Sequence, residues 1–377
     1  MFRLSFWFFL FSCIIFIYSI VNIVLVLISI AYYTLAERKI MASIQRRKGP
    51  NVVGLWGLFQ PLADGFKLFI KSKIDPKFSN VYLFSLAPIL ILTLSLFSWF
   101  FVSFCFPSSF VFFKNHIDYL AGLCSQNYYK NDLSSIITHE KIYDFLKTIN
   151  FFGVNYVSVS LLFLLAISSF NVYGIVLAGW ASNSKYAFLG SLRSAAQMIS
   201  YEVSIGIVIL PVLMLAGNLF SINDIIFKYY LTNQSKTYFF LLPCFIIFCI
   251  SILAETNRTP FDLTEAEAEL VAGYNVEYSS ITFAMFFLAE YSNMLLMAAI
   301  TVLLFFGSYW QAGWILKMLI FVCWFVSVRA TFPRYKYNEL MDIGWKTFLP
   351  ISLSFLGYVS CVLLTFNAQL VNNWNIF

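Results

Sequence analysis

Six carboxylates are concentrated in one short stretch of the chain, ILAETNRTPFDLTEAEAELVAGYNVEYSS, which begins at Ile252. They are Glu255, Asp262, Glu265, Glu267, Glu269 and Glu277, and the only cation among them is Arg258. The whole chain has 18 Asp and Glu residues, so these six are a third of its acids. Neighbouring carboxylates raise one another's pKa, so we expect some of them to hold protons near neutral pH. The alternative is a solvated charged loop, which is the usual meaning of a charge run.

Two further acids, Glu202 and Glu290, stand inside apolar sequence. A charge at membrane depth costs about 2.5–3.5 kcal/mol even on lenient insertion scales, so such residues face the protein interior, pair with a cation or bind a proton. Both are therefore candidates for proton carriers, and in the alternative interpretation a nearby arginine neutralises them. A tyrosine adjoins each acid and could hydrogen-bond in the same polar seam, Tyr201 before Glu202 and Tyr291 after Glu290.

Arginines lie close to the predicted ends of apolar stretches: Arg38 beside Glu37, then Arg193, Arg329 and Arg334. Together with the carboxylates they predict a ring of charges just inside one side of the membrane. Such a ring suits a ligand with a polar, reducible head and an apolar tail. One or two turns before Glu290, the rings of Phe283, Phe286 and Phe287 could line an apolar passage for that tail, although core packing is the commoner role of such residues.

These residues must be positioned by membrane helices, because the chain is 60% hydrophobic and only 11% charged, whereas soluble domains are about 25% charged. A helix that spans the hydrocarbon core needs about 20 mostly apolar residues. Stretches of this kind cover about 7–35, 82–106, 152–178, 196–217, 238–254, 279–307, 311–328 and 346–368. The predicted fold class is an all-α membrane protein with about eight transmembrane helices in one polytopic domain, residues 1–377.

Three segments between the spans have distinct compositions. Segment 36–81 is rich in Lys and Arg and contains LWGLFQPLADGFKLFIKS, whose apolar residues recur every three or four positions, so we expect an amphipathic helix in the membrane interface. Segment 107–150 is polar and has no recognisable motif, whereas 255–278 is the acidic loop, where Thr259-Pro260 or Thr264 could start a short helix. Lys and Arg are concentrated in the loops that follow the first, third, fifth and seventh predicted spans. These loops are therefore predicted to face the cytoplasm or the mitochondrial matrix.

No redox centre or metal site is expected in the chain itself. The seven cysteines are scattered without a C-x-x-C pair, and the two histidines, His116 and His139, both lie in 107–150. Neither a nucleotide-binding fingerprint nor iron–sulfur spacing is present, and nothing predicts a nucleic-acid partner. The chain is therefore expected to act within a complex.

Four long motifs carry a resemblance to a known family. They are AERKIMASIQRRKGPNVVGLWGLFQPLADGFKL, GWASNSKYAFLGSLRSAAQMISYEV, AETNRTPFDLTEAEAELVAGYNVEY, and the run from FPRYKYNELMD to WKTFLP. In this order they span nearly the whole chain, which resembles subunit 1 of respiratory NADH:ubiquinone oxidoreductase, complex I. Segment 107–150 is longer than the loop usual in that family, so the resemblance implies nothing for it.

The resemblance implies an eight-helix subunit at the heel of the membrane arm, with quinone as substrate. The residues implied to line or shape a quinone channel are Glu37, Arg38, Arg47, Asp64, Arg329 and Arg334. Phe283 and Phe287 are added to the channel from their position one or two turns before Glu290. The residues implied in an acidic proton or coupling path are Glu202, Glu255, Asp262, Glu265, Glu267, Glu269, Glu277 and Glu290. Arg258, the one cation of the acidic loop, and Tyr291, next to Glu290, are added to this path from their positions in the sequence. FMN and iron–sulfur clusters are then expected in partner subunits. The further partners expected are complex I membrane and peripheral-arm subunits and membrane phospholipids. Separately from the resemblance, the mixed charges and the aromatics Tyr128 and Tyr129 of segment 107–150 suit docking to an accessory subunit, with a floppy loop as the alternative.

Two other functions remain open at this point. The chain could be the membrane anchor of a related proton-translocating hydrogenase-type complex, which would share the acidic loop. It could also be a stand-alone ion carrier that uses Glu202 and Glu290, although no internal repeat supports this. Retained apolar spans from the start of the chain fit the mitochondrial inner membrane, and a bacterial plasma membrane fits equally.

Overall fold

The structure is a computed structural model of the chain. It describes residues 2–102, 159–215, 235–262, 273–306 and 311–374, together with residues 220, 222 and 225. Segment 107–150 and the three acids Glu265, Glu267 and Glu269 lie outside the described residues. What the sequence predicts for them therefore stays a prediction.

Most of the described residues are helical, and none of them lies in a strand. The α-helices are α1 (Phe2–Ile44), α2 (Gln60–Ile70), α3 (Val81–Ser98), α6 (Ser160–Ala181), α7 (Lys185–Leu215), α9 (Ser235–Glu255), α11 (Ser280–Thr301), α12 (Gln311–Thr331), α13 (Tyr337–Asp342) and α14 (Leu349–Trp374). Two short 3-10 helices, η1 (Leu55–Gly57) and η3 (Gly273–Asn275), lie in loops. Two π-helical segments, η4 (Val302–Phe306) and η5 (Ile343–Phe348), extend α11 and join α13 to α14.

Within the described residues, seven helical segments are long and apolar enough to cross a membrane. They are Ser19–Ile44, Val81–Ser98, Ser160–Ala181, Lys185–Leu215, Ser280–Phe306, Gly313–Thr331 and Tyr337–Leu363. The remaining expected span corresponds to α9, which is 21 residues long. The all-α membrane fold is confirmed, and the chain is a multi-pass membrane protein.

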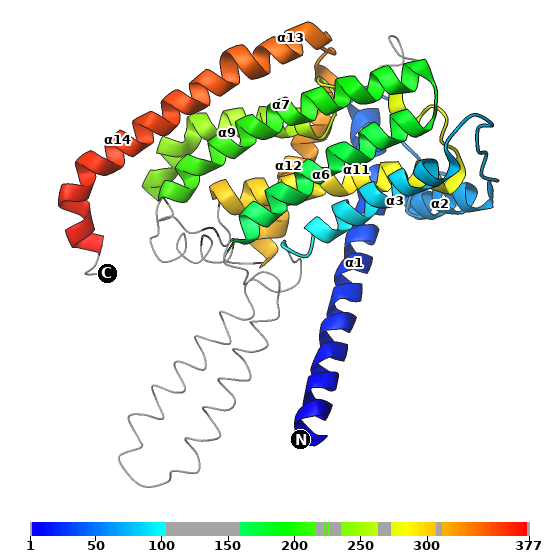
Figure 1. The fold of residues 1–377 in the computed structure, drawn as a ribbon, viewed down its shortest axis with the longest axis horizontal. Helices are drawn as coiled ribbons and strands as arrows, with labels where there is room; N and C mark the ends of the chain where they lie inside the picture. The colour runs from blue at the N-terminus through cyan, green and yellow to red at the C-terminus, as the bar shows by residue number, and fades with distance from the viewer. Residues whose placement is uncertain are drawn as a thin grey trace.

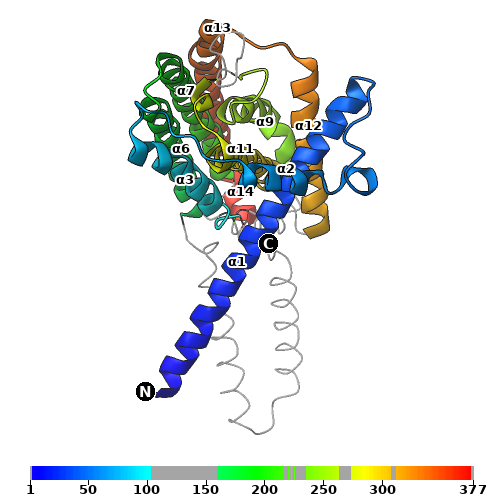
Figure 2. The ribbon, with the colours of Figure 1, turned by 90° about the vertical axis from the view of Figure 1, so that its right-hand side faces the viewer.

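The helices pack in an order that brings distant parts of the chain together. α6 lies between α3 and α7, and α7 also packs against α9 and α14. On the other side of α3 lies α11, which contacts α1, and α1 in turn contacts α12. Figures 1 and 2 show that α1 crosses its neighbours steeply and that its N-terminal part extends away from the other described helices. Only the C-terminal half of α1 is therefore placed to contribute to a site within the bundle.

The amphipathic helix predicted in segment 36–81 is present as α2. Its apolar side, formed by Leu62, Phe66, Phe69 and Ile70, is exposed, as expected for a helix that lies at a membrane interface. The turn before α2 depends on Gly57, whose φ is 75°. A Cβ at this position would meet the Pro50 carbonyl, so both the backbone angle and the space favour glycine.

One predicted helix start is wrong. Residues 256–262 form turns after α9 ends at Glu255, so Thr259-Pro260 does not open a helix. Main-chain hydrogen bonds from Asn257 N to Ala254 O and from Arg258 N to Leu253 O close this turn instead. The other predicted start, at Thr264, lies outside the described residues.

Candidate functional site

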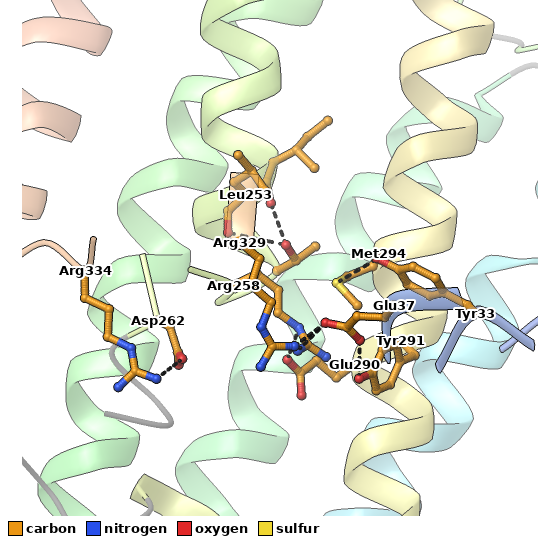
Figure 3. Close-up of polar contacts among 12 residues, drawn as sticks. Tyr33, Glu37, Leu253, Arg258, Asp262, Glu290, Tyr291, Met294, Arg329 and Arg334 are labelled. Atoms are coloured by element: carbon orange, nitrogen blue, oxygen red, sulfur yellow. Dashed lines mark hydrogen bonds and ion pairs between the residues drawn. The ribbon is translucent and has the colours of Figure 1, made fainter. Parts of the chain in front are cut away.

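A buried carboxylate, Glu37, lies at the centre of the most highly charged cluster among the described residues (Figure 3). The C-terminal part of α1 carries Glu37 into the space beside α11 and α12. Arg329 from α12 donates to its Oε1 atom, and the Tyr291 hydroxyl from α11 donates to Oε2 at 2.6 Å. Both oxygens of this acid are therefore occupied by side chains from other helices.

Arg258 connects this carboxylate with a second one. Its Nε atom lies 2.8 Å from Oε1 of Glu290, and its Nη1 atom lies 3.7 Å from Oε1 of Glu37. The guanidinium also stands 4.6 Å from the centre of the Tyr291 ring, within cation–π range. Two arginines thus face two acids, and the ionised cluster has no net charge. Because Arg258 is only 5% exposed, its charge depends on these contacts in place of water.

Tyr33 extends the cluster along α1. It lies one helical turn before Glu37, its ring meets the Tyr291 ring edge-on at 5.4 Å, and its hydroxyl donates to Met294 Sδ at 3.8 Å. The sequence analysis missed this residue. The spacing of four residues between Tyr33 and Glu37, which puts both on one helix face, is the signal that could have found it.

A second ion pair joins the loop after α9 to the loop after α12. Arg334 Nη2 lies 3.3 Å from Asp262 Oδ2, and Asp262 is buried whereas Arg334 is nearly half exposed. In Figure 3 this pair stands apart from the cluster around Glu37. The Glu37 cluster and the Arg334–Asp262 pair nevertheless both depend on the turn 256–262, because this turn carries Arg258 and, four residues later, Asp262.

Three of the residues implied in the channel lie on the surface of the described chain. Arg38 forms an exposed ion pair with Asp64 of α2 at 2.7 Å, and Asp64 also accepts from Gln60 at 3.0 Å. Arg47 is exposed and donates to Gln45 at 2.8 Å. The structure thus places Arg38 and Asp64 at the junction of α1 and α2, apart from the ion-paired cluster of Glu37.

The aromatic residues before Glu290 divide into two groups. Phe283 and Phe287 are half-buried, with ring centres 4.5 Å apart. Phe286 is buried and packs edge-on against Tyr274 and Tyr278, at 5.3 and 4.8 Å between ring centres. Phe286 belongs to a buried core cluster, against which Phe283 also packs.

The two acids predicted at membrane depth differ in their surroundings. Glu290 is paired with Arg258, as in the alternative interpretation. Glu202 makes no ion pair with the described residues and lines a groove of about 540 Å³ between α6 and α7, beside Ser169 and Tyr173. Glu255, at the end of α9, is buried, its Oε2 atom has no hydrogen-bond partner among the described residues, and Glu202 repels it electrostatically. Glu277 is half-buried.

Comparisons with known proteins identify the family of the chain. A model of the family described as NADH dehydrogenase matches residues 17–360. The chain belongs to the NADH dehydrogenase family. It is 46% identical to NADH-ubiquinone oxidoreductase chain 1 of Chondrus crispus over 364 residues. The aligned region covers 93% of this chain and 97% of that protein.

Related proteins come from both eukaryotes and bacteria. A subunit of NADH-quinone oxidoreductase from Paramagnetospirillum magneticum is 47% identical over 374 residues, 95% of each chain. NADH-ubiquinone oxidoreductase chain 1 of Arabidopsis thaliana is 45% identical over 369 residues, 92% of this chain and 97% of that protein. The resemblance inferred from the four motifs is therefore confirmed.

Proposed function

We propose that this chain, a membrane subunit of NADH:quinone oxidoreductase, forms the channel in which the quinone head group is bound and reduced. One observation carries the proposal: the buried Glu37 carboxylate is shared by Arg329, Arg258 and Tyr291, which come from different parts of the chain. Polar groups held in this way inside an apolar bundle suit a polar head group with an apolar tail. Ubiquinone is the substrate that fits, and Phe283 and Phe287 would contact its tail.

The acids would serve as the start of a proton or coupling path. Reduction of a quinone to a quinol consumes two electrons and two protons, so the charge and protonation of nearby groups must respond. Glu290 adjoins the cluster through Arg258, and Glu255 and Glu202 continue the acidic set at α9 and α7. Asp262, Glu277 and the acids Glu265, Glu267 and Glu269 would complete the path. Among these groups, a carboxylate that gains or loses a proton can exchange ion-pair partners and pass the change onward.

The partners follow from the same proposal. Electrons would reach the quinone from FMN and iron–sulfur clusters in other subunits of the complex. Phospholipids would cover the exposed apolar side of α2, and segment 107–150 would dock an accessory subunit. We place the chain in the mitochondrial inner membrane, with a bacterial plasma membrane as the alternative. The names of the relatives favour neither the hydrogenase-type anchor nor the stand-alone carrier.

The test uses the two arginines, Arg329 and Arg334, in the assembled complex. We expect Arg329→Ala or Arg334→Ala to lower the reduction of decylubiquinone by NADH, while NADH oxidation by an artificial acceptor is kept because electrons still enter upstream. Lys346→Ala is the matched control, since Lys346 is exposed and pairs only locally with Asp342. Equal loss of both activities would mean failed assembly and would remove the support for a channel role.

A further inference from the structure

Tyr201 is a fully buried tyrosine of α7 at the junction of three segments that are distant in the sequence. Its hydroxyl donates to the Leu340 carbonyl of α13 at 2.9 Å. Its ring lies 6.0 Å from that of Phe261 in the turn after α9 and 6.2 Å from that of Phe348 in η5. A single side chain thus contacts α13, η5 and the turn that carries Arg258 and Asp262.

Arg334 lies in segment 332–348, the same segment that Tyr201 contacts at Leu340 and Phe348. Beside Arg334, the Tyr335 main-chain nitrogen donates to the Pro260 carbonyl at 3.1 Å, and the Tyr335 ring stacks on Phe261 at 5.6 Å. Arg334 itself pairs with Asp262 at 3.3 Å. The loop after α12 therefore lies on the turn after α9, and α13 follows it immediately.

The loop turn that follows α9 is itself held against α7. Gln197, one helical turn before Tyr201, donates through Nε2 to the carbonyls of Ala254 and Phe261, both at 2.7 Å. Segment 332–348 is held against this turn by Arg334 and Tyr335, and Tyr201 connects it directly to α7. The hydroxyl of Tyr201 reaches this segment near the point where α-helical hydrogen bonding in α13 changes to π-helical in η5. π-Helical turns within helices are frequently found at functional sites.

We propose that Tyr201 is a positioning residue for quinone reduction: its hydroxyl anchors α13 and η5 to α7 and so keeps Arg334 against Asp262. This inference rests on the proposed function, because Arg334 is there assigned to the quinone channel. Removal of the hydroxyl leaves the ring contacts, and the Leu340 carbonyl keeps the main-chain hydrogen bond from Ile343 N. The loop that carries Arg334 then has one anchor fewer, and the guanidinium is held less well.

The first experiment compares Tyr201→Phe with Tyr278→Phe in the intact complex. Tyr278 is a matched control, because it is also buried, also donates to a main-chain carbonyl, that of Ala178 at 3.4 Å, and also packs on aromatic rings. We expect Tyr201→Phe to raise the KM for decylubiquinone about two- to tenfold, the range that one lost neutral hydrogen bond covers. The turnover number stays within about twofold of wild type, and Tyr278→Phe leaves KM within about twofold of wild type.

A double-mutant cycle with Arg334→Gln tests whether Tyr201 acts through Arg334. We expect the two effects on KM to be less than multiplicative, because a residue that only positions Arg334 has little left to do once its guanidinium is gone. Multiplicative effects, equal KM values for Tyr201→Phe and Tyr278→Phe, or loss of assembly in Tyr201→Phe would overturn the positioning role. A normal KM in Arg334→Gln alone would instead contradict the proposed channel role of Arg334.

Discussion

Substitution of Glu37 by glutamine is the sharpest perturbation that the charged cluster offers. The amide keeps the size of the side chain and can still accept the hydrogen bond from Tyr291. It cannot also accept from Arg329 or balance the charge of the guanidinium groups. The two arginines would then face a single acid, Glu290, which already pairs with Arg258 at 2.8 Å.

The size of the effect follows from burial. Removal of one partner from a buried ion pair costs about 3–5 kcal/mol, because the other charge is left without compensation. The side chain of Arg329 is 27% exposed and can turn partly toward water. We therefore expect a cost near the lower end, about 3 kcal/mol. If this cost is felt entirely in the quinone-bound transition state, it corresponds to a fall of about 100-fold in the rate of quinone reduction. A fall in quinone reductase rate of about tenfold or more is the predicted outcome, since part of the loss is relieved by rearrangement.

The assay is decylubiquinone reduction by NADH in membranes, normalised to the amount of assembled complex and to NADH oxidation by an artificial acceptor. Glu339→Gln is the control, because Glu339 is an exposed acid in the first turn of α13. We expect this variant to keep the wild-type rate within about twofold, as is usual for an exposed charge. Equal rates for Glu37→Gln and Glu339→Gln at equal assembly would refute the assignment of Glu37 to the site.

Three further predictions concern the acids, the packing and the topology. Glu290→Gln is expected to lower turnover more than the same exposed-acid control, because it removes the 2.8 Å partner of the buried Arg258; equal turnover would contradict the proton-path assignment. Gly174→Ala places a Cβ against the Ile91 side chain and is expected to cost about 1–3 kcal/mol, whereas Gly206→Ala meets no atom within 4 Å and is expected to be neutral or to stabilise by about 1 kcal/mol or less. Thermal inactivation of the purified complex measures this difference, and identical midpoints would refute the packing argument. Segment 107–150 is expected on the intermembrane or periplasmic side, so protease added from that side cleaves it, and its removal affects assembly before catalysis.

The sequence by itself was sufficient for the class of fold. Apolar stretches of membrane-spanning length predict helices because an unpaired backbone group in lipid is costly, and this constraint does not depend on how the helices pack. The same reasoning identified Glu202 and Glu290 as unusual acids, since charges at membrane depth must be compensated. The amphipathic period of α2 was likewise readable, because its apolar face lies along one side of a single helix.

The tertiary structure alone decided which charges meet. Glu37 and Arg38 are neighbours in the chain, yet successive residues of a helix point about 100° apart, so Glu37 faces α11 and α12 whereas Arg38 faces Asp64 of α2. One partner of Glu37 is Arg329, 292 residues away, and no local sequence pattern predicts this pairing. The turn after α9 could not be predicted either, because Thr259-Pro260 matches a helix start by type while contacts with Gln197 and Tyr335 fix the same residues as a turn. Ion pairing and loop shape depend on how helices cross, and the crossing is set by packing over the whole chain.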